Sequence, residues 1–210
     1  MGEAINLKDL EKKAWRSTFE DGLIDIYLGV MFFGVGTGSA FEVIFGEFYN
    51  YIFMFLMVGL GIIILALGKK YITIPRVGFV KFGKQRKVRK AKSVLVLLIN
   101  FVFLLTLWVV MGVSPGSLKL EPPLGGLIVG LFMIIPLWAV AYFIQFKRLY
   151  FHAVLIGLTP FVTDVLEFFT NNVLSIILSF DILDSIIIAT GVVFLVRFLK
   201  KYPIPKEEVG

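Results

Sequence analysis

The distribution of basic residues constrains this chain more than any other feature. If the apolar runs cross a membrane, 20 of the 21 Lys and Arg residues lie on one side, and only Lys119 lies on the other. Short basic loops stay cytoplasmic in membrane proteins. Each run is close to the roughly 20 residues that a helix needs to cross the hydrocarbon core of a bilayer. The six runs are 22–45, 50–68, 93–112, 123–146, 149–170 and 174–197.

The composition agrees with this topology. Hydrophobic residues make up 58% of the 210 positions, 22 of which are Phe, and the mean hydropathy is +0.90. A soluble domain cannot bury so much apolar surface. Five or seven crossings would scatter the cations over both faces, whereas six keep them together. The sequence therefore predicts an all-α protein, a bundle of six transmembrane helices with both termini in the cytoplasm.

The pattern divides the chain into five segments. Residues 1–21 are polar and amphipathic, which is typical of a helix on the cytoplasmic surface of a membrane. Such a helix orients the first span or docks a partner. Residues 22–68 hold the first two spans, 69–92 form a basic cytoplasmic arm, 93–199 hold the other four spans, and 200–210 form a cytoplasmic tail.

The basic arm is the longest connection between spans. Its first half, 71–82, is rich in β-branched and aromatic residues around a turn signal at Pro75 and Gly78, which predicts a short β-hairpin or an extended strand. Its basic residues anchor the topology, or they bind anionic lipid headgroups or a cytoplasmic protein. They adjoin the ends of spans, which disfavours nucleic acid as the partner. The candidate binding residues are Arg76, Lys81, Lys84, Arg86, Lys87, Arg89, Lys90 and Lys92.

Glycines four residues apart occur in two predicted spans. Gly34 and Gly38 have this spacing in the first span, and Gly126 and Gly130 have it in the fourth. Small residues at this spacing let helix backbones approach closely in lipid. We expect these four glycines to lie at helix contacts within one bundle rather than to serve a function of their own. A homo-oligomer is a separate assembly that the sequence leaves open.

Acidic residues in the last two spans are the candidate chemical site. Asp164 and Glu167 are three residues apart, as are Asp181 and Asp184, so each pair shares a helix face. In an antiparallel hairpin of 149–170 and 174–197, all four lie toward the outer side of the bilayer. A carboxylate in hydrocarbon must be protonated, hydrated or bound to a cation. The alternative is a wet outer loop in which these acids are ordinary solvated groups. Asp25, at the inner end of the first span, is expected to pair with the basic inner face.

Several classes of site are excluded by composition. The chain has no Cys and a single His, His152, which excludes disulfides, thiolate chemistry, iron–sulfur clusters and the usual zinc sites. No metalloprotease, serine hydrolase or P-loop motif is present. The sequence indicates no cofactor and no enzymatic activity, and it leaves the identity of any bound metal open.

Two segments resemble a known group of proteins. Asp21-Gly-Leu-Ile-Asp-Ile-Tyr-Leu-Gly29 and Pro75-Arg-Val-Gly-Phe-Val-Lys-Phe82 are similar to segments of uncharacterised prokaryotic multi-pass membrane proteins. The resemblance implies a protein of a prokaryotic plasma membrane and no particular activity. Two hypotheses remain: a noncatalytic module that docks lipid or a partner through its basic arm, and a cation or proton-coupled transporter or channel that uses the four acids.

Overall fold

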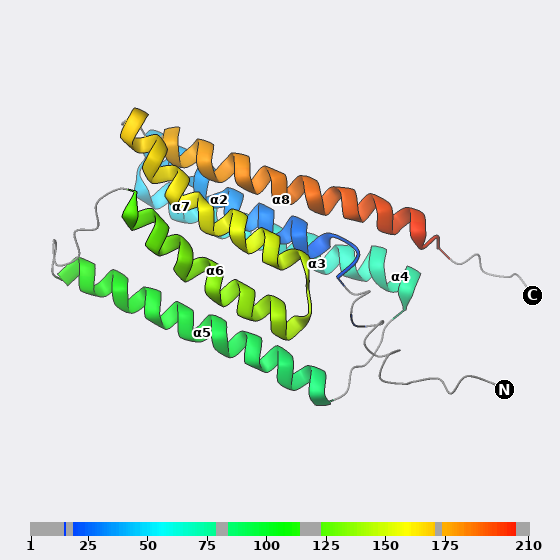
Figure 1. Cartoon of the computed structure of the whole chain (residues 1–210). Coiled ribbons are helices and arrows are strands. Elements are labelled where there is room, and N and C mark those ends of the chain that lie inside the picture. Colours follow the sequence, from blue (N-terminus) through cyan, green and yellow to red (C-terminus); the bar gives the residue numbers. More distant parts are fainter. Residues whose placement is uncertain (1–14, 16–18, 79–83, 114–122, 171–173, 205–210) are drawn as a thin grey trace, which may run out of the picture.

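The chain folds into long helices that run alternately up and down (Figure 1). The computed structural model describes residues 15, 19–78, 84–113, 123–170 and 174–204. No strand occurs within these ranges, which confirms the all-α prediction. The long helices are α2 (Leu23–Phe45), α3 (Glu47–Gly68), α5 (Lys84–Val113), α6 (Leu124–Ile144), α7 (Arg148–Thr170) and α8 (Leu174–Lys201).

The helices have the length and surface of membrane spans. Among the described residues, five are long and apolar enough to cross a membrane, namely α2, α3 with its continuation to Val77, α6, α7 and α8. The predicted third span, 93–112, lies within α5. Large apolar side chains point outward, and those of Phe55 and Phe101 are 79% and 63% exposed. A surface of this kind is stable against lipid rather than water, so the architecture is that of a multi-pass membrane protein.

The helix contacts place α8 between α2 and α7 in the middle of the bundle. α2 packs against α3 on one side and α8 on the other, whereas α7 packs against α6 and α8. Within the described part of the chain, α5 makes its main contacts with α6 alone, so it lies at the edge of the bundle (Figure 1). α7 and α8 run antiparallel, as the sequence predicted.

Glycines form the closest helix contacts. A Cβ atom at Gly34 or Gly38 would meet side chains of α3, and one at Gly126 or Gly130 would meet backbone atoms of α7. These four glycines therefore pack helices against one another within one bundle, as expected. A second set, Gly22, Gly29 and Gly36, is spaced seven residues apart and faces α8. This set brings the α2 backbone against α8 along most of its length.

The segment predicted as a basic arm, 69–92, is helical at every described residue except Gly78. A π-helical turn, η1 (Lys69–Thr73), and a short helix, α4 (Ile74–Val77), continue α3. The predicted hairpin over 71–82 is therefore wrong for residues 71–77, and residues 79–82 lie outside the described ranges. Pro75 falls in the first turn of α4, where its missing N–H is not needed. The basic run that follows forms the first turns of α5.

Other predictions concern residues at the chain ends. The predicted surface helix over 1–21 lies outside the described ranges except for Trp15 and residues 19–21. Trp15 is helical and buried, and its Nε1 donates a hydrogen bond to the carbonyl oxygen of Ile144 at 2.6 Å. Most of the tail, residues 205–210, also lies outside those ranges.

Candidate functional site

The side chain of Asp184 is buried in the interior of the bundle. It is 1% exposed, and neither of its carboxyl oxygens has a hydrogen-bond partner among the described residues. Asp181 lies one helical turn earlier on α8, and its Oδ2 accepts a hydrogen bond from Thr37 Oγ1 at 3.1 Å. Its Oδ1 is buried and also lacks a partner there. Buried polar groups in folded proteins are nearly always paired, so this pair of acids needs an explanation.

Two glycines of α2 position this pair. A Cβ atom at Gly36 would meet Oδ1 of Asp181, and one at Gly29 would meet the backbone oxygen of Asp184. The α2 backbone therefore lies against the carboxyl group of Asp181 and against the α8 backbone at Asp184. These contacts also give the levels of the acids in the bundle, with Asp181 beside Gly36 and Asp184 nearer to Gly29.

Hydroxyl groups line the α7–α8 contact beyond Asp181. Thr163 Oγ1 and Ser179 Oγ lie 2.5 Å apart, and both side chains are buried. Ser179 Oγ also lies 2.7 Å from the carbonyl oxygen of Ser175, whose own side chain is buried. Thr163 Oγ1 similarly donates to the carbonyl oxygen of Thr159 at 2.9 Å. These hydroxyls extend a polar interior toward the α7–α8 connection.

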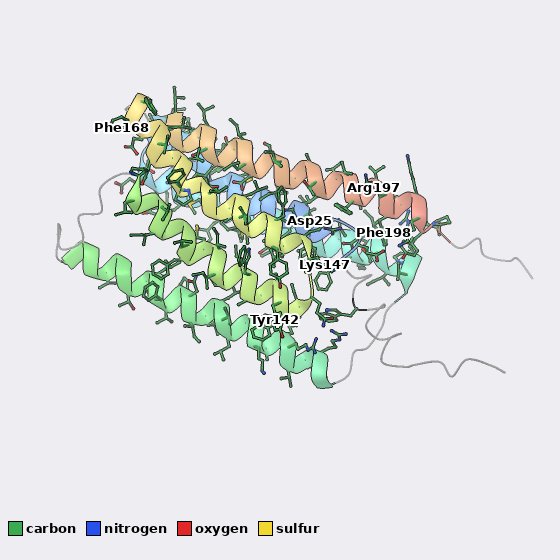
Figure 2. All side chains as sticks on the ribbon, in the orientation of Figure 1. Asp25, Tyr142, Lys147, Phe168, Arg197 and Phe198 are labelled. Carbon is green, nitrogen blue, oxygen red and sulfur yellow. The ribbon has the colours of Figure 1, made fainter. Side chains whose placement is uncertain are left out.

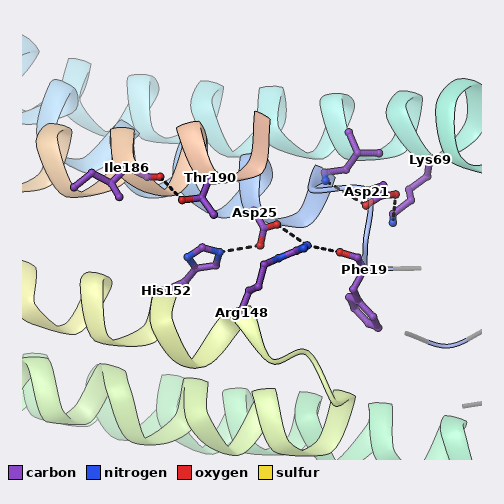
Figure 3. Close-up of polar contacts among 9 residues, drawn as sticks. Phe19, Asp21, Asp25, Lys69, Arg148, His152, Ile186 and Thr190 are labelled. Carbon is purple, nitrogen blue, oxygen red and sulfur yellow. Dashed lines mark hydrogen bonds and ion pairs between the residues drawn. The ribbon is translucent and has the colours of Figure 1, made fainter. Parts of the chain in front are cut away.

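A second buried carboxyl group, that of Asp25, has an imidazole beside one oxygen and a guanidinium beside the other (Figure 3). His152 Nε2 lies 2.8 Å from Asp25 Oδ1, and a terminal guanidinium nitrogen of Arg148 lies 2.8 Å from Oδ2. Asp25 and His152 are both 0% exposed. The Arg148 guanidinium also donates to the carbonyl oxygen of Phe19 and lies 3.8 Å from the centroid of the Phe194 ring. The expected pairing of Asp25 with the basic face is thus confirmed.

A third buried acid, Asp21, stands at the start of α2. Its Oδ2 pairs with Lys69 Nζ at 2.6 Å and accepts a hydrogen bond from the Thr73 hydroxyl, while its Oδ1 accepts one from the backbone N–H of Leu23 at 3.2 Å. These contacts join the beginning of α2 to η1 (Figure 3). We call the end of the bundle that carries Asp21, Lys69, Arg148 and Lys201 the basic end. Lys201, at the end of α8, pairs there with Glu20 at 3.0 Å.

The acids form a column along α2. Thr37 donates a hydrogen bond to Asp181 and so marks the level of that acid on α2. Asp25 and Thr37 are 12 residues apart on α2, which separates their levels by roughly 18 Å along the helix axis. Asp184 lies between these levels, since its backbone oxygen faces Gly29. The apolar side chains of Ile156 and Ile187 are also buried in this region. The polar side chains of the column are therefore interrupted by apolar ones. It extends over more than half of a hydrocarbon core about 30 Å thick.

The four acids predicted from the sequence take separate positions. The Asp181 carboxyl group contacts α2, and Asp184 is buried with its backbone oxygen beside Gly29 of α2. Asp164 Oδ2 accepts a hydrogen bond from the backbone N–H of Gly126 at 2.6 Å, so it interacts with the start of α6. Glu167 is exposed. Sequence reasoning missed His152 as the partner of Asp25, and the only local signal was a His within an otherwise apolar helix.

The predicted lipid-binding residues are also dispersed. Arg76 donates to the carbonyl oxygen of Ile72 at 2.9 Å, and Arg86 donates to Gln145 Oε1 at 3.0 Å. Lys81 and the side chain of Lys84 lie outside the described set. The exposed cations on α5 are Lys87, Arg89, Lys90 and Lys92.

The described residues contain no group of three or more His, Cys, Asp or Glu side chains suited to hold a metal ion. Comparisons of this chain with protein-family models, curated proteins and solved structures found no match. Its chemistry must therefore be inferred from the geometry of the bundle alone.

Proposed function

We propose that this protein conducts protons across a membrane through the buried acids on α2 and α8. The observation that supports the proposal is the Asp184 side chain, which is buried with both carboxyl oxygens unpartnered in the described part of the chain. A lone carboxylate in a low-dielectric interior is strongly disfavoured, whereas a carboxyl group that takes up a proton is tolerated there. Such a group costs stability and is retained where it has a function.

The surroundings of Asp184 supply neighbours for proton transfer. Asp181 lies one turn away on α8, and one of its carboxyl oxygens lacks a partner among the described residues. The Thr163 and Ser179 hydroxyls lie beyond Asp181, toward the α7–α8 connection. Toward the basic end, the His152 imidazole has a buried Nδ1 without a hydrogen-bond partner among the described residues. Imidazole and carboxyl groups are the usual carriers of protons within membrane proteins.

The geometry favours a proton over a hard metal cation. Sodium, calcium and magnesium ions take about six or more oxygen ligands in proteins. The two neighbouring acids, together with the Thr37 hydroxyl that donates to Asp181, offer fewer oxygens than this. A proton needs only one acceptor and an adjacent donor.

The proposal is tested by proton flux in vesicles. Purified protein is reconstituted into liposomes that contain a pH-sensitive dye, and a potassium gradient with valinomycin supplies the driving voltage. The wild-type protein is expected to acidify the lumen faster than protein-free vesicles do. Asp184→Asn, which keeps the shape but loses the titratable group, is expected to lower the rate at least about tenfold, in the range for loss of a proton-transfer group.

The matched control is Glu167→Gln, because Glu167 is an exposed acid on α7 outside the column. It is expected to conduct like the wild type. Equal rates for Asp184→Asn and the wild type, with both proteins folded by circular dichroism, would contradict the proposal. A wild-type rate equal to that of empty vesicles would do so as well.

We further propose that the basic end faces the cytoplasm of a prokaryotic cell, because cations at span ends stay on that side. The chain contains no Cys, so single cysteines can report the topology. Lys200→Cys is expected to react with a membrane-impermeant maleimide only after the cells are permeabilised, and Glu167→Cys is expected to react in intact cells. The reverse pattern would refute the orientation, and labelling of both from one side would refute the crossing of α7 and α8.

A further inference from the structure

A cationic cavity opens at the basic end between α5 and the α6–α7 turn. Its volume is about 480 Å³, and its polar lining comes from Arg89, Lys92, Tyr142, Gln145, Lys147 and Tyr150. Three of these side chains are cations, and no carboxylate of the described residues lines the cavity. Cavities of this size hold small ligands, and the charge selects an anion.

The local structure explains how the cavity forms. α6 ends where Gln145 adopts the left-handed conformation, with φ of 59°, and this sharp turn places Lys147 beside the end of the helix. Arg86 donates to Gln145 Oε1 at 3.0 Å and so fixes the start of α5 against the turn. Arg89 and Lys92 are three residues apart and therefore share one face of α5. Figure 2 shows Tyr142 on α6 beside α5, and Lys147 at the turn.

An apolar groove continues the same seam between α5 and α6. Its volume is about 330 Å³, and its lining includes Val96, Ile99, Phe103, Phe132, Ile135 and Ala139. Val96 lies one turn after Lys92 on α5, and Ala139 lies about one turn before Tyr142 on α6. The groove therefore starts roughly one helical turn, or about 5 Å, deeper than the cavity. A cationic cavity at the end of the seam is thus followed by an apolar groove at membrane depth.

We propose that this seam binds one anionic phospholipid. The phosphate lies among Arg89, Lys92 and Lys147, and one acyl chain lies along the groove between α5 and α6. Basic pockets between helices at the membrane surface bind such headgroups, and a guanidinium forms paired hydrogen bonds with phosphate oxygens. The tyrosine hydroxyls at the cavity add hydrogen-bond donors at the level where aromatic residues meet headgroups.

The edge position of α5 gives this lipid a structural effect. Among the described residues, α5 makes its main helix contacts with α6 alone. A lipid that contacts both helices adds a second connection between them. Binding to the folded state alone raises the stability of that state, so the lipid is expected to raise the melting temperature of the protein.

The test is native mass spectrometry of the full chain released from detergent with defined lipids. Dioleoyl phosphatidylglycerol is expected to stay bound in a one-to-one complex, whereas dioleoyl phosphatidylcholine is lost. Arg89→Gln with Lys92→Gln is expected to weaken phosphatidylglycerol binding roughly 10- to 30-fold, the effect of two interfacial charges. The matched control, Lys87→Gln with Lys90→Gln, removes the same charge from exposed positions of α5 that do not line the cavity.

Equal weakening by the two double variants would show that only net charge matters and would overturn the proposal. Equal retention of the two lipids by the wild type would also overturn it. Two further arms distinguish a lipid from a free phosphate. Glycerol 3-phosphate in excess is expected to leave the lipid bound, and Ala139→Phe, which fills the groove, is expected to weaken lipid binding. Displacement by glycerol 3-phosphate would assign the cavity to a soluble phosphate compound instead.

Discussion

Asp25 and Asp184 are both buried carboxyl groups, but their surroundings differ. Asp25 has a cation on one oxygen and an imidazole on the other, whereas Asp184 has no hydrogen-bond partner among the described residues. Loss of one member of a buried ion pair leaves the other charge uncompensated and costs about 3–5 kcal/mol. Replacement of an unpartnered buried polar group by an apolar one removes a desolvation penalty. Substitution by an apolar residue is therefore expected to lower the free energy of unfolding at Asp25 but not at Asp184.

We predict that Asp25→Leu lowers the free energy of unfolding by about 3–5 kcal/mol, because it removes the carboxylate that pairs with the partly buried Arg148 guanidinium. Asp184→Leu is predicted to leave this free energy unchanged or to raise it by about 1 kcal/mol, while it abolishes proton flux. Thermal unfolding in detergent, followed by circular dichroism, measures both changes. A large loss of stability in Asp184→Leu would mean that Asp184 has a structural role.

Asp181 and Asp184 were identified from sequence because acids three residues apart within an apolar run are conspicuous. The partners of the buried acids could not be identified from sequence, because these contacts depend on long-range packing. His152 and Asp25 are 127 positions apart, and nothing near either residue indicates the contact. Asp164 was grouped with the other acids from its level in the hairpin, but the helical rotation of α7 turns its carboxyl group toward α6.

At the scale of helices, the glycines of α2 determine how closely the column is enclosed. A Cβ atom at Gly29 would lie 2.5 Å from Cγ1 of Ile188 and 3.0 Å from the backbone oxygen of Asp184. A methyl group there must push α8 away from α2, since backbone atoms cannot turn aside. Gly59 on α3 offers a contrast, because nothing lies within 4 Å of a Cβ atom at that position.

We predict that Gly29→Ala lowers the free energy of unfolding by about 1–3 kcal/mol through overpacking. Gly59→Ala, the matched control, is expected to leave it unchanged or to raise it by up to about 1 kcal/mol, because Ala favours the helix. Chemical unfolding of the two variants in the same detergent gives the comparison. Equal stability of both variants would show that α2 and α8 are not held as closely as described.

The helices were predictable from hydropathy, since six apolar runs correspond to six long helices. The helical structure of segment 71–77 could not be predicted, because its β-branched residues favour a strand locally. There, continuation of α3 and the contacts of Asp21 with Lys69 and Thr73 outweigh the local preference. The basic run was expected to be an arm, whereas its residues continue directly into the apolar part of α5.

At the scale of the whole molecule, charge and burial are arranged along one axis. The ion pairs of Asp21, Asp25 and Glu20 lie at the basic end, and Asp184 and Asp181 lie deeper along α8. Apolar side chains cover the outer surface. In the proposed function, a proton reaches Asp184 through the interior formed by α2, α7 and α8.

Proton selectivity in a planar bilayer tests this claim most directly. With a pH difference and equal salt on the two sides, the reversal potential of the wild-type current is predicted to shift by about 59 mV per pH unit, the value for one charge per proton. The current is predicted to disappear in Asp184→Asn. A reversal potential that follows potassium or chloride instead, or a current that persists in Asp184→Asn, would contradict the proton column.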